Sequence, residues 1–232
     1  DSGQRLGNGS TDGINFGDFD SDGDLDAFES INGTANSFWV NDGSGVFTET
    51  QTIGGFRATK DAAVGDLDGD GDLDIVSASL SDDTIAWYEN DGRQNFTAHT
   101  ISTRAEGARS VFAADLDGDG DTDVLSASTR DSKIAWYEND GSENFTEHTI
   151  STEADGARSV FAADVDGDGD IDVLSASIFD DKIAWYENDG SENFTPHTIS
   201  TDADFAHSVF AADVDGDGDI DVLSASRYDD KI

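Results

Sequence analysis

The sequence predicts an all-β fold: a β-propeller of four-stranded antiparallel blades, with five repeats in the chain. Three observations support this prediction. First, the segment VFAADVDGDGDIDVLSAS stands at 160–177 and again at 209–226, with a close copy that begins at Val111 and a looser one at Ala62. Second, each repeat contains segments that are typical of four short strands. Third, the repeat is 48 or 49 residues long, and a propeller blade takes about 40–50 residues. No segment has the 3.6-residue period of a helix, so almost no helix is expected.

The four strands can be assigned within one repeat, residues 158–199. The first is small and apolar, which suits a buried strand, and a tight Asp/Gly loop follows it at 164–172. The second alternates in polarity, and the third carries Trp185 and Tyr186, residue types that favour strands. An Asn-Asp-Gly turn at 188–190 is a hairpin signal before the fourth strand. The strands are therefore expected at 159–163, 173–177, 182–187 and 194–199.

We expect residues 1–232 to form one propeller domain whose ends cut within a repeat. Asp1 begins just after the point where other units read Phe-Thr, and Ile232 stops before the expected Ala-Trp-Tyr segment. The five repeats therefore either close as a five-bladed ring or form part of a larger propeller. A β-solenoid is the alternative fold, but its coils are usually shorter, and the Asn-Asp-Gly hairpin turns argue against it.

The composition excludes several classes of function. Asp and Glu number 52 against 12 Lys and Arg, which gives a formal charge of −40. Ordinary nucleic-acid binding is excluded, because phosphate contacts need clustered cations. Hydrophobic residues make up 35% of the chain, which is enough for a core despite the charge. No run of about 18 apolar residues occurs, so no membrane span is expected. The absence of cysteine excludes disulfides and thiol sites.

Every repeat carries an acidic loop of the form Asp-x-Asp-x-Asp-Gly-Asp-x-Asp, which we interpret as a calcium site. Five carboxylates within nine residues repel one another, so such a loop beside a buried strand would oppose folding without a cation. Oxygen ligands at positions 1, 3, 5 and 9 suit Ca²⁺, which takes about six to eight oxygens. Position 7 is expected to ligate through its backbone carbonyl. The glycine at position 6 supplies a sharp turn. The loops stand at 18–26, 66–74, 115–123, 164–172 and 213–221.

About one Ca²⁺ per repeat is expected, and other metals fit less well. Mg²⁺ resists full dehydration, and zinc favours cysteine and histidine, which the loops lack. The first loop also matches an EF-hand, with Glu29 at position 12, but its flanks are β-like rather than helical. The candidate side-chain ligands are Asp18, Asp20, Asp22, Asp26, Asp66, Asp68, Asp70, Asp74, Asp115, Asp117, Asp119, Asp123, Asp164, Asp166, Asp168, Asp172, Asp213, Asp215, Asp217 and Asp221. The position-7 candidates are Asp24, Asp72, Asp121, Asp170 and Asp219.

The repeats resemble the FG-GAP/VCBS family, which includes the N-terminal propeller of integrin α-subunits. The Asp-x-Asp-x-Asp-Gly-x-x-Asp loop carries the resemblance, which covers nearly the whole chain. The resemblance implies Ca²⁺ bound by Asp18, Asp20, Asp22 and Asp26, and by the matching residues of each later loop. It also implies a secreted or cell-surface protein used in adhesion, carbohydrate binding or matrix contact. Propellers of this family commonly have seven blades, whereas this chain shows five repeats.

Most of the cations are expected on the end of the blades opposite to the acidic loops. Four residues occupy one equivalent position just before the innermost strand, where the first repeat has Asp12, and they are expected to form a partial ring near the axis. They either pair with neighbouring acids or bind an anionic or polyhydroxyl ligand. The turns after Ser-Ala-Ser differ between copies, as recognition loops do. The candidate ligand-binding residues are Lys60, Arg109, Arg158 and His207 of the ring, and Arg130, Phe179 and Tyr228 of the turns.

The leading functional hypothesis is a non-enzymatic, Ca²⁺-stabilised, extracellular binding or adhesion module for a glycan or a protein. The sequence has no Gly-x-Ser-x-Gly elbow, and calcium accounts for most of the paired carboxylates. The alternatives are the propeller domain of a secreted polysaccharide-active enzyme and a purely structural repeat array. Association with the rest of a larger parent protein, or with copies of itself, is also open. The recurring Trp87, Trp136 and Trp185 are expected to pack, and His99, His148 and His197 to be surface or inter-blade residues.

Overall fold

The computed structural model describes residues 6–7, 10–54 and 58–228, and this described part is all-β. Five sheets follow one another along the chain, four of four strands and a fifth of two, and we call them blades 1 to 5. Blade 1 holds β1 (Thr11–Gly17), β2 (Asp26–Ile31), β3 (Asn36–Asn41) and β4 (Phe47–Ile53). Blade 2 holds β5 (Thr59–Gly65), β6 (Asp74–Ser79), β7 (Thr84–Asn90) and β8 (Phe96–Ser102). Blade 3 holds β9 (Ala108–Ala114), β10 (Asp123–Ser128), β11 (Lys133–Asn139) and β12 (Phe145–Ser151). Blade 4 holds β13 (Ala157–Ala163), β14 (Asp172–Ser177), β15 (Lys182–Asn188) and β16 (Phe194–Ser200), and blade 5 holds β17 (Ala206–Ala212) and β18 (Asp221–Ser226).

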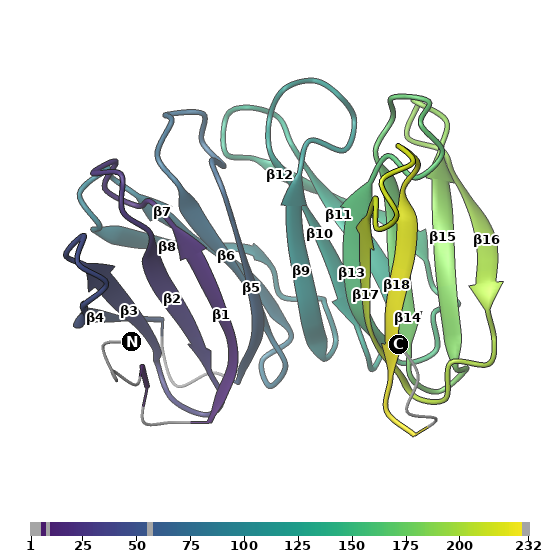
Figure 1. The fold of residues 1–232 in the computed structure, drawn as a ribbon, viewed down its shortest axis with the longest axis horizontal. Helices are drawn as coiled ribbons and strands as arrows, with labels where there is room; N and C mark the ends of the chain where they lie inside the picture. Colours follow the sequence, from purple (N-terminus) through teal and green to yellow (C-terminus); the bar gives the residue numbers. More distant parts are fainter. Residues whose placement is uncertain (1–5, 8–9, 55–57, 229–232) are drawn as a thin grey trace.

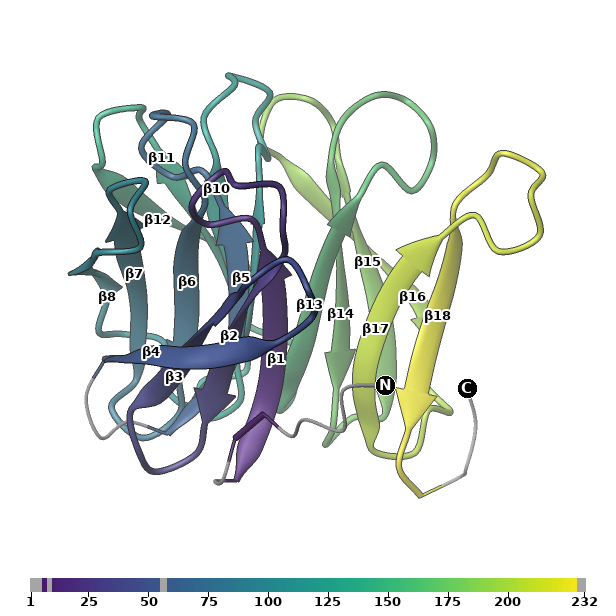
Figure 2. The same cartoon turned by 60° about the vertical axis from the view of Figure 1, so that its left-hand side comes forward.

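Each full blade is an antiparallel meander whose strands pair in chain order, as the turn signals predict. The acidic loop joins the first strand to the second, and the Asn-Asp-Gly turn joins the third to the fourth. The first strands of successive blades neighbour one another, and the blades fan outwards from them (Figures 1 and 2). These strands, β1, β5, β9, β13 and β17, are called the inner strands below.

The blades form an open arc rather than a ring. Within the described residues, blade 5 does not pair with blade 1, and no apolar cluster joins the two. Phe16 on β1 and Phe210 on β17 are each about half exposed, at 50% and 51%. The closed five-bladed ring, one of the two expected arrangements, is therefore not formed, because the faces that would have to meet are not packed together.

The hydrophobic core lies between the blades. The cluster between blades 3 and 4 contains Trp136 from one blade and Val160 and Tyr186 from the next. Equivalent clusters fill the spaces between the other successive blades. Both faces of β11 are covered, which explains why its sequence is apolar without strict alternation. Trp87 and Trp136 are each 1% exposed, so the prediction that they pack is confirmed.

A tryptophan, a histidine and a glutamate form a repeated contact on the outer half of blades 2 to 4. In blade 2 the rings of Trp87 and His99 stack with centroids 4.6 Å apart, and His99 Nε2 lies 2.8 Å from Glu89 Oε2. The strand register places the tryptophan opposite the histidine. The same contact recurs with Trp136, His148 and Glu138, and with Trp185, His197 and Glu187.

The first acidic loop is not an EF-hand, because strands flank it. Glu29, which matches position 12 of that motif, lies inside β2 and is 1% exposed. Its carboxylate accepts hydrogen bonds from Trp39 Nε1 at 3.2 Å and from the Thr11 hydroxyl. Glu29 therefore belongs to the packing of blade 1, and its match to the EF-hand pattern is coincidental.

Candidate metal loops and an axial pocket

The acidic loops all lie at the same end of the inner strands, at the top of Figure 1. In blade 3 the Asp115 carboxylate accepts the N–H of Gly118 at 2.7 Å and of Gly120 at 3.1 Å. Asp117 and Asp119 each accept the N–H two residues further on, at 3.1 and 2.9 Å. The same bonds recur in blades 2, 4 and 5. Backbone N–H groups therefore fix the orientation of the carboxylates at positions 1, 3 and 5.

The last aspartate of the loop is buried in blades 1 to 4, at the start of the second strand. Asp123 is 0% exposed, and its two oxygens accept the N–H of Leu116 at 2.9 Å and of Asn139 at 2.8 Å. Burial raises the pKa of Asp123 to about 7 and that of Asp74 to about 7, although these N–H groups favour the ionised form. A cation nearby would offset the cost of burying such a charge.

In blades 2 to 4, a buried asparagine at the end of the third strand joins the acidic loop of its own blade to that of the preceding blade. Asn139 is 1% exposed, and its Nδ2 donates to the carbonyl of Thr122 at 3.1 Å in its own blade. The same nitrogen donates to the carbonyl of Leu67 at 2.7 Å, in the acidic loop of blade 2. Asn90 and Asn188 make the equivalent pairs of bonds. The shape of each loop is therefore coupled to the packing of the blades.

The structure brings together three of the predicted side-chain metal ligands in each loop of blades 1 to 4. In blades 1 to 4, one oxygen from each of three loop aspartates lies within 4.8 Å of the other two. The Oδ1 atom of Asp20 is buried and has no hydrogen-bond partner in the described part of the chain. All-oxygen donor sets of this kind suit Ca²⁺. The loops therefore fit a hard divalent cation, and the identity of that cation stays a prediction. The groups are Asp18, Asp20 and Asp22; Asp66, Asp68 and Asp70; Asp115, Asp117 and Asp123; and Asp164, Asp166 and Asp172.

The aspartate at position 7 lies against the Asn-Asp-Gly turn of its own blade. In blade 3 the Asp121 carboxylate sits where a Cβ on Gly141 would be, and Gly141 has a φ of 69°. A side chain at Gly141 would therefore meet both backbone strain and a steric clash. Asp24, Asp72 and Asp170 lie in the same way against Gly43, Gly92 and Gly190. That position 7 offers a cation its backbone carbonyl stays a prediction.

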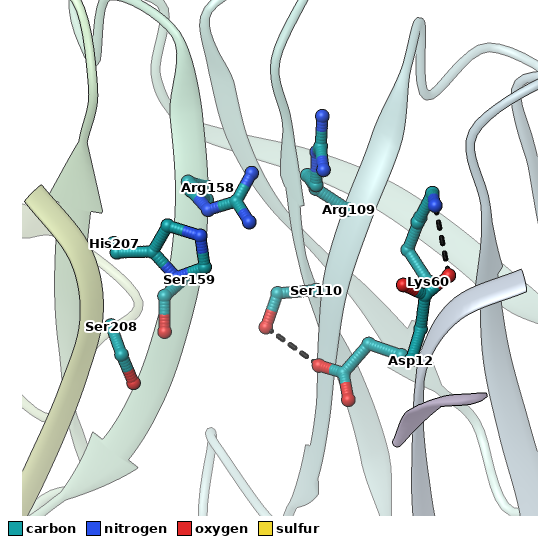
Figure 3. A pocket seen from close by; sticks show the side chains of 9 residues that line it. Asp12, Lys60, Arg109, Ser110, Arg158, Ser159, His207 and Ser208 are labelled. Carbon is teal, nitrogen blue, oxygen red and sulfur yellow. Dashed lines mark hydrogen bonds and ion pairs between the residues drawn. The ribbon is translucent and has the colours of Figure 1, made fainter. Parts of the chain in front are cut away.

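A pocket of about 310 Å³ lies at the other end of the inner strands (Figure 3). Lys60, Arg109, Arg158 and His207 line it, together with Asp12. Each is the second residue of its inner strand, and the acidic loop follows the last residue of the same strand. Six residues of extended chain, from Arg109 to Asp115, span about 20 Å. The structure thus places the four ring residues around one pocket, as expected, and their role in binding stays a prediction.

Every one of these pocket residues is the extra residue of a β-bulge. In blade 3 the register passes from Ser110 opposite Ala127 to Ala108 opposite Ser128, which leaves Arg109 without an opposite residue. The same shift leaves out Asp12, Lys60, Arg158 and His207 in the other blades. A bulge changes the direction of a side chain, so the cation and the residue after it both line the pocket.

The positive charge of the pocket is only partly paired. Lys60 Nζ lies 2.8 Å from Asp12 Oδ2, whereas Arg109 and Arg158 have no ion-pair partner among the described residues. The Nε atom of each arginine is buried without a hydrogen-bond partner from the described chain. Burial, followed by the like charge of Arg109, lowers the pKa of Arg158 to about 10, so this guanidinium stays protonated at neutral pH. Burial and then Arg158 lower the pKa of His207.

Serine hydroxyls and one carboxylate complete the lining. The Ser110 hydroxyl donates to Asp61 at 2.8 Å, and the N–H of Val111 donates to the same carboxylate at 3.2 Å. The Ser159 hydroxyl accepts the N–H of Val209 at 3.3 Å. The N–H of Ala62 donates to the other Asp61 oxygen at 2.9 Å, and burial raises the pKa of Asp61 to about 6 despite these three donors. Ser208 follows His207 on β17 and also lines the pocket.

The Asp61 carboxylate makes stability depend on pH. Its folded pKa of about 6 lies above the ordinary value of 3.8, so the folded state favours the protonated form. The contribution is fully present below about pH 4 and is lost as the pH rises through about 6. Asp61→Asn should therefore raise the unfolding free energy by about 1–3 kcal/mol above pH 7 and change it little near pH 4. Urea unfolding of both proteins across this range, at saturating calcium, measures the effect. An equal difference at both ends of the range would contradict the assignment.

The chain matches a known repeat family along most of its length. The family model of the FG-GAP-like repeat matches residues 18–77, 66–126, 115–175 and 164–224. The chain belongs to the FG-GAP-like repeat family. Each FG-GAP match begins at an acidic loop and ends in the second strand of the next blade. The match therefore spans the junction between blades, which Asn90, Asn139 and Asn188 also bridge.

A solved structure shares the fold of this FG-GAP chain. It is a lectin from Agrocybe aegerita, described for its specific recognition of non-reducing terminal N-acetylglucosamine, with a TM-score of 0.65 and 19% sequence identity. The alignment covers 93% of the FG-GAP chain and 61% of the lectin chain, so the FG-GAP chain spans about three fifths of it. No curated protein sequence matches the FG-GAP chain significantly. Its described residues include no helix with the length and apolar character needed to cross a membrane.

Three residues predicted to bind ligand lie outside the axial pocket of the FG-GAP chain. Arg130 Nη1 is 3.0 Å from Asp83 Oδ1, and Phe179 and Tyr228 are each 62% exposed. The Tyr228 ring packs on Phe205 with centroids 5.0 Å apart. These residues follow the second strand of their blades, one strand further from the axis than the pocket residues. They do not line the axial pocket, and their role in ligand binding stays a prediction.

Four residues of the pocket escaped the sequence analysis. Each directly follows one of the four ring residues in the chain: they are Asp61, Ser110, Ser159 and Ser208. Successive strand residues normally point to opposite faces, so a shared pocket is not expected for neighbours. The bulge removes that alternation, and the sequence carries no separate signal for it. The serine that follows Arg109, Arg158 and His207 was the available clue.

Proposed function

We propose that this FG-GAP chain is a calcium-stabilised, non-enzymatic binding module that recognises a glycan at the axial pocket. The observation that carries the proposal is the set of β-bulges at Arg109, Arg158 and His207, which direct these three side chains towards one pocket. Bulges are frequent where a side chain must be aimed at a ligand. The pocket volume of about 310 Å³ is at the lower end of the range for small-ligand sites, roughly 300–1,000 Å³.

The electrostatics of the pocket support a binding role. The chain has 52 acidic residues, yet the described part places none of them in an ion pair with Arg109 or Arg158. Burial lowers the pKa of both guanidinium groups, and the charge of Arg109 lowers that of Arg158 further, which is a cost to folding unless a ligand offsets it. Perturbed charges that converge in a pocket are typical of functional sites.

The structural neighbour supports the class of ligand. It is a lectin that recognises terminal N-acetylglucosamine, and its fold resembles that of the FG-GAP chain. At 19% identity this likeness concerns the fold, so the sugar that the FG-GAP chain prefers has to come from its own pocket. Hydroxyl groups and guanidinium groups there offer the hydrogen bonds that a polyhydroxyl ligand needs.

Calcium has a structural role in this proposal. Cations in the acidic loops would fix the far ends of the inner strands, about 20 Å from the pocket. Calcium sites of extracellular modules bind at about 10⁻⁴–10⁻³ M, which matches the calcium level outside cells. The proposal therefore includes an extracellular or cell-surface setting, with adhesion to a glycan or to a glycan-bearing protein.

A glycan array read with and without calcium tests the proposal, followed by a product assay on each glycan that binds. The expected result is retention of a defined class of glycans in calcium, loss of retention in EDTA, and no product by mass spectrometry. Formation of product would favour a polysaccharide-active enzyme. No retention of any glycan by the folded, calcium-loaded chain would favour a structural array and would contradict the proposal.

A further inference from the structure

The charged groups of the axial pocket are divided between its two sides. Both carboxylates lie on β1 and β5, and both already have partners: Asp12 pairs with Lys60, and Asp61 accepts Ser110 and Val111. The opposite side is formed by β9, β13 and β17, which supply Arg109, Arg158 and His207. Figure 3 shows the Arg158 side chain reaching from β13 towards the side of the pocket that carries Arg109. The pocket therefore has a cationic side whose two arginines have no ion-pair partner within the described residues.

Hydroxyl donors lie beside these cations. Ser159 and Ser208 follow Arg158 and His207 on the same bulges and line the same pocket. The Ser159 oxygen accepts a backbone N–H, which leaves its own hydrogen free to donate. Guanidinium groups donate hydrogen bonds but accept none, and their planar fork fits carboxylate or sulfate oxygens with two bonds. The free groups on this side therefore favour a ligand rich in acceptor oxygens.

We infer that the axial pocket binds an acidic sugar, with its carboxylate or sulfate group held by Arg109 and Arg158 and its hydroxyl groups by Ser159 and Ser208. The inference rests on the proposed function and adds the charge of the ligand to it. The overall charge of −40 does not prevent this binding. At physiological ionic strength, charges beyond about 8 Å are largely screened, so the local arginines decide the interaction.

Binding to three probes tests the inference: N-acetylglucosamine, 6-O-sulfo-N-acetylglucosamine and an oligogalacturonate, each measured by calorimetry with the calcium-loaded chain. Inorganic sulfate serves as a fourth probe for an anion without a sugar. Arg109→Gln and Arg158→Gln each remove one guanidinium, and Arg93→Gln is the matched control, because Arg93 is exposed in the hairpin beside the acidic loops. Arg158→Lys keeps the positive charge but removes the planar guanidinium group that can make two parallel hydrogen bonds. Melting temperatures show that each variant is folded.

Binding of one or both acidic probes, at least tenfold tighter than the neutral sugar, is the expected result. Arg109→Gln and Arg158→Gln should each weaken this binding by about 10- to 100-fold, because a hydrogen bond to a charged group is lost. Arg158→Lys should give a partial loss and Arg93→Gln none. Equal affinity for neutral and acidic sugars, unaffected by the arginine variants, would overturn the inference and leave the proposed function standing. Binding of sulfate as tight as that of the sulfated sugar would instead overturn the assignment to a sugar.

Discussion

Removal of calcium with EDTA is expected to lower the melting temperature of the chain by more than about 20 °C. Each acidic loop gathers five carboxylates within nine residues, and in blade 3 backbone N–H groups donate hydrogen bonds to those at positions 1, 3 and 5. A ligand that binds only the folded state adds about 2.7 kcal/mol per site at a hundredfold excess over Kd. Over five loops the total is about 13 kcal/mol, comparable with the whole stability of a typical domain, roughly 5–15 kcal/mol. Circular-dichroism melts in calcium and in EDTA measure the change.

Two variants of the blade 3 loop distinguish loss of cation binding from relief of charge repulsion as causes of a change in melting temperature. Asp117→Asn removes a carboxylate of the clustered set, and Asp121→Asn removes an equal charge from the side chain that lies against Gly141. Asp117→Asn should reduce the calcium-dependent rise in melting temperature by about 5–10 °C, and Asp121→Asn should preserve it. A melting temperature that EDTA leaves unchanged, or an equal loss in both variants, would contradict the assignment of the loops as cation sites.

Asn139→Ala is expected to lower the unfolding free energy by about 2–5 kcal/mol. The side chain is 1% exposed and donates to two carbonyls, one in its own blade and one in the acidic loop of blade 2. Its Oδ1 also accepts the N–H of Gly141 at 3.3 Å. Alanine would leave these buried groups without partners, and each buried unpaired polar group costs about 1–3 kcal/mol. Urea unfolding at saturating calcium measures the loss.

Asn144→Ala is the matched control for this substitution. Asn144 lies in the hairpin of the same blade, and its exposed amide bonds only to Asp140 and Ser142 within that hairpin. Its substitution should cost less than about 1 kcal/mol. If both variants lose the same free energy, the bridge between blades is not what stabilises the junction.

The blades were predictable from the sequence because their signals are local and repeated. The Asp/Gly loop and the Asn-Asp-Gly turn fix the meander, and the strands fall within two residues of the predicted ranges at each end. The repeat spacing also identified Lys60, Arg109, Arg158 and His207 as equivalent positions, and the structure places them around one pocket. In each of these cases a short segment determines its own conformation.

The remaining features depend on contacts between segments far apart in the chain. The bond from Asn139 to Leu67 crosses 72 residues, and no local pattern announces it. The Glu89–His99 pair depends on the strand register, which the predicted strand ranges do not fix. The bulges at Arg109 and Arg158 arise where inner strands meet near the axis, so Ser110 and Ser159 were missed. The open arc likewise depends on which faces meet, and not on any one repeat.

Calcium stoichiometry is the most direct test of the central claim, that divalent cations bound by the clustered aspartates stabilise the blades and so maintain the axial pocket. Titration of EDTA-stripped, dialysed protein with calcium by isothermal calorimetry, with native mass spectrometry of the product, gives the number of ions bound. The account predicts about one ion for each of the five acidic loops, with a higher melting temperature as the sites fill. A chain that takes up no calcium at millimolar concentration, yet melts at the same temperature, would contradict it.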